Sequence, residues 1–462
     1  MTHIAVIDIG KTNAKLALVD RATLSEVAVV TRPNTVLAGP PWPHFDLEGH
    51  WDFLLDSLAS FHAAHLIDAI SITTHGASCV LLDTEGGLAA PMLDYEHPGP
   101  DDLSDTYDRL RPSFRETGSA RLSGGLNMGA QLHWMFTQDP TLKDRTAQIL
   151  TYPQYWAFRL TGIAATERTS LGCHTDLWCP DQDAPSSLVR SLGIDDKIAP
   201  VRMASDILGT ITSQVATRTG LPADTPVTCG IHDSNASLLP HLLARTSPFS
   251  VVSTGTWIIA MTVGGTNPSL DPDRDTLINV NAFGRPVPSA RFMGGREFEQ
   301  IVAGVQAVPT SADVDAVLAN GTMLMPAVEQ STGPFAGCKS VWLPQEPDIG
   351  TGQRSVAAAY YCAMVTATCL SLTGHQGDIV VEGPFAGNME FLSMLTVATG
   401  CSVIAAENAT GTSQGAALLI CENSSQPVDN VYEITEAERT ILARYAANWR
   451  KLCARNCMSQ LN

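Results

Sequence analysis

Positive charge is scarce in this sequence. Its 462 residues include 28 lysines and arginines against 47 aspartates and glutamates, which gives a formal net charge of −19. Nucleic acids and anionic membranes both require a basic surface, so we expect neither as a partner. Only six residues are lysine, and two of them, Lys11 and Lys15, lie close together near the N-terminus. Two nearby cations in an acidic chain indicate a site for an anion.

Signatures of several other protein classes are missing as well. The eleven cysteines include no C-x-x-C pair, so we expect no disulfide framework and no zinc site, and a reducing cytoplasm is the expected compartment. G-x-G-x-x-G and the Walker pattern are absent, which argues against Rossmann dehydrogenases and P-loop enzymes. The first residues lack the basic and apolar regions of a signal peptide. The longest apolar segment, 355–372, is interrupted by Tyr, Cys and Thr and predicts a buried helix rather than a membrane span.

Length and apolar patterning predict more than one α/β domain. At about 150 residues per domain, a chain of this length predicts two or three domains. Three apolar runs over 4–32 predict an antiparallel meander, and helical spacing of apolar residues over 50–65 predicts a helix. Strands that alternate with helices indicate an α/β lobe. Further strands are expected at 69–72, 79–82 and 225–230, with a mostly helical insertion at 98–162.

The second half repeats this order, with strands early and helices late. It follows a hinge at Arg245-Thr246-Ser247-Pro248, and we therefore expect two similar lobes, 1–245 and 246–462. Proline-rich loops are expected at 268–290 and 344–350. The expected strands are 249–253, 257–263, 378–382 and 401–405, and the expected helices are 353–373, 389–399, 411–420 and 437–454.

Each half contains a short turn between two strands with glycine and hydroxyl groups, Gly10-Lys11-Thr12 and Thr254-Gly255-Thr256. Glycine lets backbone N–H groups approach a ligand closely, and concave sets of N–H groups bind phosphate. Asp8 stands at the strand end before the first turn, where a carboxylate can hold Mg²⁺ together with phosphate oxygens. A plain β-turn is the alternative for the first turn alone. The presence of two such turns favours a polyphosphate held between two lobes.

Two further segments place polar residues at strand ends. Asp233 follows a strand in the middle of the chain, where it can act as a general base or simply cap the next helix. His75-Gly76 lies between two strand segments, where the histidine can bind a sugar hydroxyl or serve a structural role. The segment from Gly383 to Asn388 joins a strand to a helix, a place where adenine can lie against the backbone.

Taken together, these motifs resemble the FGGY carbohydrate kinases, enzymes with two actin-like, ribonuclease H-like lobes of the α/β class and a nucleotide cleft between them. The similarity runs in order along essentially the whole chain. The segments 73–83 and His232-Asp233 most resemble the rhamnulokinase and fuculokinase branch. The chain departs from that branch at Arg291 and Glu299, where amide side chains are usual, and from the family at 384–385, where further glycines are usual.

The resemblance implies a role for each motif. The segment 8–15 corresponds to the first phosphate motif, 253–257 to the second, 230–233 to the segment with the catalytic aspartate, and 383–388 to the adenosine motif. The implied metal ligand is Asp8 for Mg²⁺, the implied base is Asp233, the implied sugar contacts are His75, Gly76, His232 and Glu167, and the implied ATP contacts are Gly10, Lys11, Thr12, Asn13, Lys15, Gly255, Thr256, Gly383 and Asn388.

We therefore expect a kinase that transfers the γ-phosphate of ATP to a hydroxyl of a ketose such as rhamnulose, fuculose, ribulose or xylulose, or of a polyol. Asp233 would accept the proton of that hydroxyl. An actin-like or chaperone-like ATPase, or a sugar-responsive regulator without catalysis, remains possible on the same fold. The expected ligands are a sugar and ATP, and the resemblance implies a possible homodimer.

Overall fold

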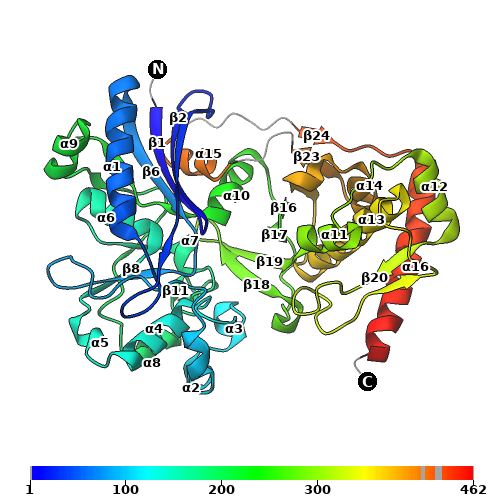
Figure 1. Cartoon of the computed structure of the whole chain (residues 1–462), viewed down its shortest axis with the longest axis horizontal. Helices are drawn as coiled ribbons and strands as arrows, with labels where there is room; N and C mark the ends of the chain where they lie inside the picture. Colours follow the sequence, from blue (N-terminus) through cyan, green and yellow to red (C-terminus); the bar gives the residue numbers. More distant parts are fainter. Residues whose placement is uncertain (1–2, 407–410, 422–428, 461–462) are drawn as a thin grey trace. The chain divides into compact units, whose positions relative to one another are not determined.

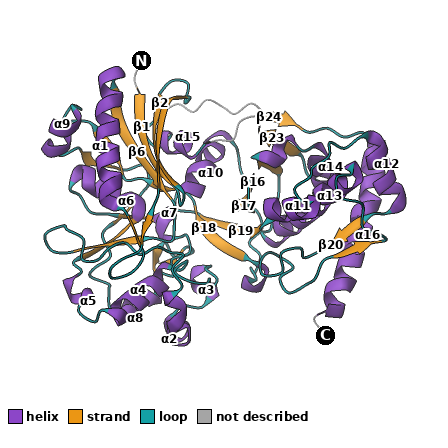
Figure 2. Cartoon of the chain, in the orientation of Figure 1, coloured by secondary structure: helices purple, strands orange, loops and turns teal. Residues whose placement is uncertain are grey.

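The chain folds into two compact units. The computed structural model describes residues 3–406, 411–421 and 429–460, and Figures 1 and 2 show its helices and strands. Unit 1 contains the residues up to Ala244 and two later segments, Ile278–Pro286 and Thr410–Gln426. Unit 2 contains the rest of the chain. Two short pieces of the second half, which we had assigned to the second lobe, therefore make their contacts with the first unit.

Unit 1 is built on a mixed sheet. Its strands are β1 (His3–Ile9), β2 (Asn13–Asp20), β3 (Glu26–Pro33), β6 (Ile67–Thr74), β13 (Ile207–Thr210), β14 (Pro226–Thr228) and β15 (Ile231–His232). The meander predicted for 4–32 is confirmed, because β1 pairs antiparallel with β2 and β2 with β3. On its other side β1 pairs parallel with β6, which in turn pairs parallel with β14 and β15. The carboxyl ends of β1, β6 and β15 therefore lie at one edge of the sheet.

Helices cover both faces of this sheet. They include α1 (Leu47–Ala64), α10 (Asp233–Ala244) and α15 (Thr412–Ala417), and Figure 1 shows α1 on one side of β1 and β2 and α10 with α15 on the other. Alternate residues of β1 point to opposite faces. Ile7 packs with Leu54 and Leu58 of α1, whereas Val6 packs with Ala236 of α10 and Ala416 of α15. A helix from the second half of the sequence thus completes the core of unit 1.

The remaining elements of unit 1 form the predicted insertion and its surroundings. The segment 98–162 is mostly helical, as expected, and includes one strand, β8, that pairs with β7. These elements are β4 (Val36–Leu37), β5 (His44–Phe45), β7 (Cys79–Leu82), α2 (Ser104–Leu110), α3 (Phe114–Thr117), α4 (Met128–Gln138), α5 (Leu142–Arg145), β8 (Gln148–Thr151), α6 (Tyr152–Thr161), β9 (Thr166–Glu167), α7 (Arg168–Leu171), β10 (Trp178–Cys179), β11 (Ala184–Pro185), α8 (Ser187–Leu192), β12 (Val201–Arg202) and α9 (Ser213–Thr219).

Unit 2 repeats the strand pairing of unit 1. The second seven-stranded sheet has the order β18 (Thr276–Val280), β19 (Pro286–Phe292), β17 (Ile258–Val263), β16 (Phe249–Thr254), β22 (Asp378–Glu382), β23 (Val403–Ala406) and β24 (Asp429–Val431). It belongs to unit 2 except for the part of β18 and β19 that falls in the segment Ile278–Pro286. Strand β16 pairs antiparallel with β17 and parallel with β22, as β1 does with β2 and β6. The predicted hairpin and the internal repeat are confirmed. The loop predicted over 268–290 is wrong, because it contains β18 and β19. Pro268 and Pro272 precede β18, Gly284 lies between the two strands, and Pro286 and Pro288 lie in the first half of β19.

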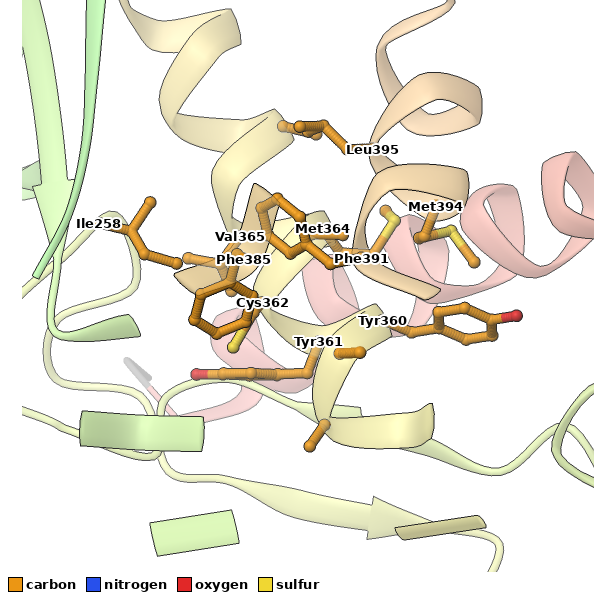
Figure 3. Close-up of a cluster of buried hydrophobic side chains, with 14 of the residues drawn as sticks. Ile258, Tyr360, Tyr361, Cys362, Met364, Val365, Phe385, Phe391, Met394 and Leu395 are labelled. Atoms are coloured by element: carbon orange, nitrogen blue, oxygen red, sulfur yellow. The ribbon is translucent and has the colours of Figure 1, made fainter. Parts of the chain in front are cut away.

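The core of unit 2 surrounds one long apolar helix, α13. Its helices are α11 (Gly294–Val302), α12 (Ser311–Asn320), α13 (Gly352–Leu372), α14 (Met389–Thr399) and α16 (Glu436–Gln460), and a small hairpin joins β20 (Met323–Met325) to β21 (Val341–Leu343). Helix α13 is long and apolar enough to cross a membrane, but 83% of its apolar window is buried in the fold. Figure 3 shows Tyr361, Cys362 and Val365 of α13 beside Phe385 and Phe391. The predicted core helix is confirmed.

Candidate active site

The first turn joins β1 to β2 with its backbone held from two sides. The amide of Gly10 donates to the carbonyl of Asn13 over 2.9 Å, and the amide of Asn34 donates to the carbonyl of Thr12 over 2.9 Å. The side chain of Asn34 also donates to the carbonyl of Gly10 over 2.9 Å. A Cβ added to Gly10 would have its nearest neighbour at 3.8 Å, an ordinary contact distance. The fold itself therefore does not require glycine at this turn.

Asp8 and Lys15 form an ion pair directly behind this turn. They lie opposite each other across the β1–β2 ladder, with Lys15 Nζ 3.0 Å from Asp8 Oδ2 and 3.2 Å from Glu26 Oε1. Burial opposes the charge on Lys15, but the two carboxylates raise its pKa overall. Thr412 and Ser413 of α15 also donate to Asp8 Oδ2. Both charges are thus fixed at the end of the central strand.

Lys11 has partners that the sequence did not indicate. Its ammonium forms ion pairs with Asp94 and with Glu96 Oε2, the latter at 3.1 Å. It also lies 4.6 Å from the ring centre of Tyr95 and 5.0 Å from that of Phe45, distances typical of cation–π contacts. The structure therefore connects the first turn to the segment 94–96, to which we had assigned no role.

Asp233 stands at the start of α10 with its side chain 30% exposed. The amide of Ser234 donates to Asp233 Oδ1 over 2.6 Å, and His232 Nε2 lies 3.2 Å from the same oxygen. Among the described residues, the hydrogen bonds given for this carboxylate all use Oδ1. Burial opposes the charge on His232, but Cys173, Asp233 and Glu167 together raise its pKa to about 9. His232 is therefore protonated at neutral pH, with its Nε2 next to the side chain of Asp233.

His75 and Gly76 form a loop next to His232. Burial lowers the pKa of His75 to about 4, and the nearby charges of Asp233, Lys11 and His232 act on it as well. Its Nδ1 donates to the carbonyl of Gly76 over 2.9 Å, whereas Nε2 is buried without a hydrogen-bond partner among the described residues. An unsatisfied buried nitrogen is costly and indicates a missing ligand or water. A Cβ on Gly76 would lie 2.7 Å from His232 Nε2, so only glycine fits there.

Three aromatic rings pack around the imidazole of His75. The ring centres of Tyr152, Tyr95 and Phe45 lie 4.9, 5.1 and 5.4 Å from that of His75. The amide of His75 donates to the carbonyl of Ile9 over 2.8 Å, which fixes the loop to the end of β1. The neutral imidazole is therefore oriented before any ligand binds.

Glu167 is linked to His232 through the hydroxyl of Thr169. It is only 1% exposed, and its carboxylate accepts hydrogen bonds from the backbone and hydroxyl groups of Thr169 and Ser170. The hydroxyl of Thr169 in turn accepts the amide hydrogen of His232 over 3.0 Å. Burial raises the pKa of Glu167 to about 7 despite these bonds. In this structure Glu167 caps α7 and reaches His232 through Thr169, and its predicted contact with a sugar stays a prediction.

One functional candidate was missed in the sequence analysis. Cys173 is 4% exposed, and its sulfur and His232 Nε2 both lie next to Gly76, 3.5 and 2.7 Å from where a Cβ would stand. Burial opposes ionisation of this thiol, but His232 and His174 lower its pKa to about 5. The adjacent Cys-His pair, six residues after Glu167, was the only local signal, because the partnership with His232 depends on the tertiary fold.

The second turn and the segment 383–388 meet within unit 2. The hydroxyl of Thr254 donates to the carbonyl of Glu382 and accepts the amide hydrogen of Phe385 over 3.2 Å. Gly383 has a φ of +81°, and a Cβ there would lie 2.0 Å from the carbonyl oxygen of Thr254. A Cβ on Gly255 would instead have its nearest neighbour at 3.9 Å. Gly383 is required by the fold, and Gly255 is not.

The other predicted contacts of unit 2 serve the local fold in this structure. The backbone carbonyl of Thr256 accepts the amide hydrogen of Arg296 over 3.3 Å. Asn388 caps α14, with its side-chain oxygen accepting the amide hydrogen of Phe391 over 2.9 Å. Pro384 and Phe385 stand in a short 3₁₀ turn, η3 (Pro384–Gly387), where the ring of Phe385 packs against Phe391. The predicted nucleotide roles of Gly383 and Asn388 stay predictions.

The region of Asp8 suits a hydrated divalent cation better than a cage of protein ligands. Among the described residues, no group of three or more His, Cys, Asp or Glu side chains has the arrangement of a metal site. Mg²⁺ commonly keeps several waters and uses one or two carboxylates together with substrate phosphates. Asp8, at the end of β1 beside a glycine turn, fits that mode of binding.

The chain is similar to known sugar kinases. The family models described as "FGGY family of carbohydrate kinases, N-terminal domain" and "Carbohydrate kinase FGGY, C-terminal domain" match residues 3–240 and 246–428. A solved structure of a carbohydrate kinase from Novosphingobium aromaticivorans is 35% identical, covers 98% of both chains and superimposes with a TM-score of 0.90.

Matches of lower identity are also to sugar kinases. A xylulose kinase structure from Rhodospirillum rubrum has 18% identity, full coverage of both chains and a TM-score of 0.79, and it shows similarity of fold alone. An L-fuculokinase from Salmonella typhi is 27% identical over 273 residues, which is 57% of each chain. The match therefore spans little more than half the length of this curated relative.

Proposed function

Because the chain belongs to the FGGY family of carbohydrate kinases, we propose that it transfers the γ-phosphate of ATP to a hydroxyl of a ketose or polyol. Its fold is the α/β fold with two actin-like units. The observation that carries the proposal is the group of His75, Gly76, His232 and Asp233 at the sheet edge of unit 1, where a buried histidine nitrogen without a partner among the described residues lies near a partly exposed carboxylate.

Asp233 is proposed as the general base. Its Oδ1 is occupied by Ser234 and His232, so Oδ2 is the oxygen that would accept the hydroxyl proton. The imidazolium of His232 stabilises the ionised carboxylate and orients it. A positioned base typically contributes about 10²–10⁴ in rate. Proton removal frees the hydroxyl oxygen for in-line attack on the γ-phosphorus.

The sugar is proposed to lie against His75 and Gly76. Nε2 of His75 would exchange a hydrogen bond with a sugar hydroxyl, which would satisfy a buried nitrogen that lacks a partner among the described residues. At Gly76 the backbone itself would face the sugar, since a side chain there would lie 2.7 Å from His232 Nε2. A ketose such as rhamnulose, fuculose, ribulose or xylulose has several hydroxyls, which suits a site with several polar groups in a small region.

The two glycine turns are proposed to bind the phosphates of ATP. Gly10 and Gly255 both have room for a Cβ, so the fold does not explain the choice of glycine, and close approach of a ligand to the backbone does. Lys15 would supply positive charge on one side, and Asp8 would hold Mg²⁺, which neutralises charge on the phosphates. That both turns serve one triphosphate stays a prediction from the sequence.

A screen of ATP consumption tests the proposal. The protein is incubated with ATP, Mg²⁺ and each of a series of C4 to C7 ketoses and polyols, and ADP release is followed by a coupled assay. We expect release that depends on one sugar class and is lost in Asp233→Ala. ADP release that is the same with and without every sugar would favour an ATPase, and no turnover with measurable ATP binding would favour a regulator.

A further inference from the structure

The first turn is bound by Asn34, a buried residue that directly follows β3. Asn34 is 8% exposed and contacts the turn with two donors. Its backbone amide donates to the carbonyl of Thr12 and its side-chain Nδ2 donates to the carbonyl of Gly10, both over 2.9 Å. One residue outside the turn therefore fixes two of the peptide groups inside it.

The bond to Gly10 also sets the direction of an N–H group. In a planar trans peptide the C=O and the N–H point in opposite directions. The carbonyl of Gly10 shares its peptide with the amide of Lys11, so this N–H is directed away from Asn34. Among the described residues, no backbone carbonyl accepts the amide hydrogen of Lys11 or Thr12. These N–H groups are therefore available to an anion.

The side chain of Asn34 is in turn oriented by His50 of α1. His50 is fully buried, with its Nε2 2.8 Å from Asn34 Oδ1 and its Nδ1 2.8 Å from Nη1 of Arg32. A guanidinium has only donors, so Nδ1 accepts from Arg32 and Nε2 carries the hydrogen that is donated to Asn34. Because Oδ1 is the acceptor of this bond, Nδ2 of Asn34 is the atom that faces the carbonyl of Gly10.

Arg32 is held at the other end of this chain of hydrogen bonds. It forms an ion pair with Asp46, which caps the N-terminus of α1. Burial, together with the charge of Arg32, lowers the pKa of His50 to about 4, so the imidazole is neutral at neutral pH and its Nδ1 can accept. The chain therefore runs from the start of α1 through Arg32, His50 and Asn34 to the first turn, and each group in it has one possible role.

We propose that Asn34 is a positioning residue for ATP and that His50 acts through it. Asn34 holds the peptide between Gly10 and Lys11 so that the N–H of Lys11 is directed at a phosphate oxygen. A peptide that is oriented before the ligand arrives does not have to be ordered during binding, and this raises affinity. The inference rests on the proposed function, because it requires the first turn to bind phosphate.

Asn34→Ala removes the donor without adding charge. We expect the Kd for a non-hydrolysable ATP analogue with Mg²⁺, measured by calorimetry, and the KM for ATP to rise at least about tenfold. The kcat and the KM for the sugar should stay within about threefold, because the variant leaves the group around Asp233 intact. An affinity for the analogue equal to that of the wild type would overturn the role of Asn34 alone. Failure of the wild type itself to bind the analogue would overturn the proposed function and the role of Asn34 with it.

Asn127→Ala is the matched control. Asn127 is also buried, its Nδ2 donates to the carbonyl of Ala120 over 3.0 Å, and its Oδ1 accepts the amide hydrogen of Leu122 over 2.7 Å. It precedes α4 in the insertion rather than contacting the turn. Asn127→Ala should lower the unfolding free energy as Asn34→Ala does, yet keep the Kd for the analogue within about twofold. An equal loss of affinity in both variants would overturn the proposal, because it would then follow from destabilisation in general.

His50→Phe tests whether His50 acts through Asn34. The variant keeps the amide of Asn34 but removes the bond that orients it, so the Kd for the analogue should rise about fivefold. In the double variant, adding His50→Phe to Asn34→Ala should raise the Kd by less than about twofold further, since both changes act on the same amide. Effects of the two changes that multiply would overturn the role of His50.

Discussion

The two glycine turns have the same position in their sheets but are stabilised differently. In unit 1 the turn after β1 is surrounded by charge, with Lys11 paired to Asp94 and Glu96 and Lys15 paired to Asp8. In unit 2 the turn after β16 is fixed by a hydroxyl and by close backbone packing. A repeated fold has therefore kept the strand pairing while the residues around the turn diverged in chemistry.

This difference suggests that the two units contribute differently to catalysis and to nucleotide binding. Unit 1 combines fixed charges with the group of His75, His232 and Asp233, which suits proton transfer and the neutralisation of phosphate charge. Unit 2 offers backbone groups around Gly255 and Gly383 beside the hydroxyl of Thr254, which suits the shape recognition of a nucleotide. We therefore expect a variant of Asp233 in unit 1 to change rate more than nucleotide affinity, and a variant of Gly255 in unit 2 to change nucleotide affinity more than rate.

The largest effect is expected from Asp233→Asn. Removal of the base should lower kcat by about 10²–10⁴, while the affinity for an ATP analogue measured by calorimetry stays within about twofold. Ser234→Ala is the matched control, because it alters the neighbouring hydroxyl and keeps the carboxylate. If Asp233→Asn retains wild-type turnover, the carboxylate only caps the helix, and unit 1 does not supply the catalytic base.

The next effect concerns the two glycines of unit 2. Gly383→Ala places a Cβ at a φ of +81° and 2.0 Å from a carbonyl oxygen, so it should cost about 3 kcal/mol or more of unfolding free energy. Gly255→Ala should leave stability within about 1 kcal/mol, because its Cβ has room. We nevertheless expect Gly255→Ala to weaken ATP binding at least about tenfold. Denaturant unfolding and calorimetry measure the two effects.

Gly10→Ala is the matching variant in unit 1. Its Cβ also has room, so stability should stay within about 1 kcal/mol. If Gly10→Ala and Gly255→Ala both bind ATP like the wild type, neither turn approaches the phosphates closely and the proposed role of both is wrong.

A buried acid in each unit should make stability depend on pH. Burial raises the pKa of Glu167 in unit 1 and of Glu297 in unit 2 from 4.5 to about 7. Since the folded pKa lies above the unfolded one, each acid contributes stability that is full below about pH 4.5 and is lost as pH rises through 7. A shift of this size corresponds to something on the order of 3 kcal/mol. These two acids alone should therefore lower the unfolding free energy between about pH 4.5 and 7. His50 and His75, whose pKa values burial lowers from 6.5 to about 4, raise it over about pH 4 to 6.5, so the contribution of each acid is measured as the difference between the wild type and its glutamine variant.

The two glutamine variants separate the units. Glu167→Gln and Glu297→Gln should each remove one part of this fall, because the amide does not titrate. A glutamine variant whose unfolding free energy changes with pH in the same way as that of the wild type would show that the hydrogen bonds to that glutamate outweigh its burial.

The smallest effect is expected for the ion pair of Lys11. A double-mutant cycle with Lys11→Met and Asp94→Asn should give a coupling of about 0.5–1 kcal/mol in unfolding free energy, because both side chains are mostly buried. The pair of Lys15 and Glu26, whose acid is 40% exposed, is the control and should couple less. A coupling near zero for Lys11 and Asp94 would indicate that the lysine is free to serve a ligand.

Much of the fold could be predicted from local pattern, because strand alternation, helical spacing and glycine turns are recorded in neighbouring residues. The hairpins, the core helix α13 and helix α14 followed from such signals. The loop predicted over 268–290 was wrong because proline and glycine outweighed the apolar residues of β18 and β19. That α15 packs in unit 1 could not be predicted, because its contact with Ala236 through Gly415 joins residues far apart in the chain.

In the candidate site too, local signals could be predicted from the sequence and long-range contacts could not. Strand ends pointed to Asp8, His75 and Asp233 because ligand groups gather there in α/β sheets. The pairing of Lys11 with Asp94 spans 83 residues and left no local signal. The capping role of Glu167 did have a local signal, since a residue just before a helix often accepts the amides two and three residues later, here those of Thr169 and Ser170.

The most direct test of the account is the stoichiometry of the products. The protein is incubated with ATP, Mg²⁺ and the preferred sugar from the screen, and ADP and sugar phosphate are quantified together by mass spectrometry. The account predicts one sugar monophosphate for each ADP, with both products lost in Asp233→Asn. ADP formed without sugar phosphate would contradict it, because phosphate would then pass to water and the group around Asp233 would not activate a sugar hydroxyl.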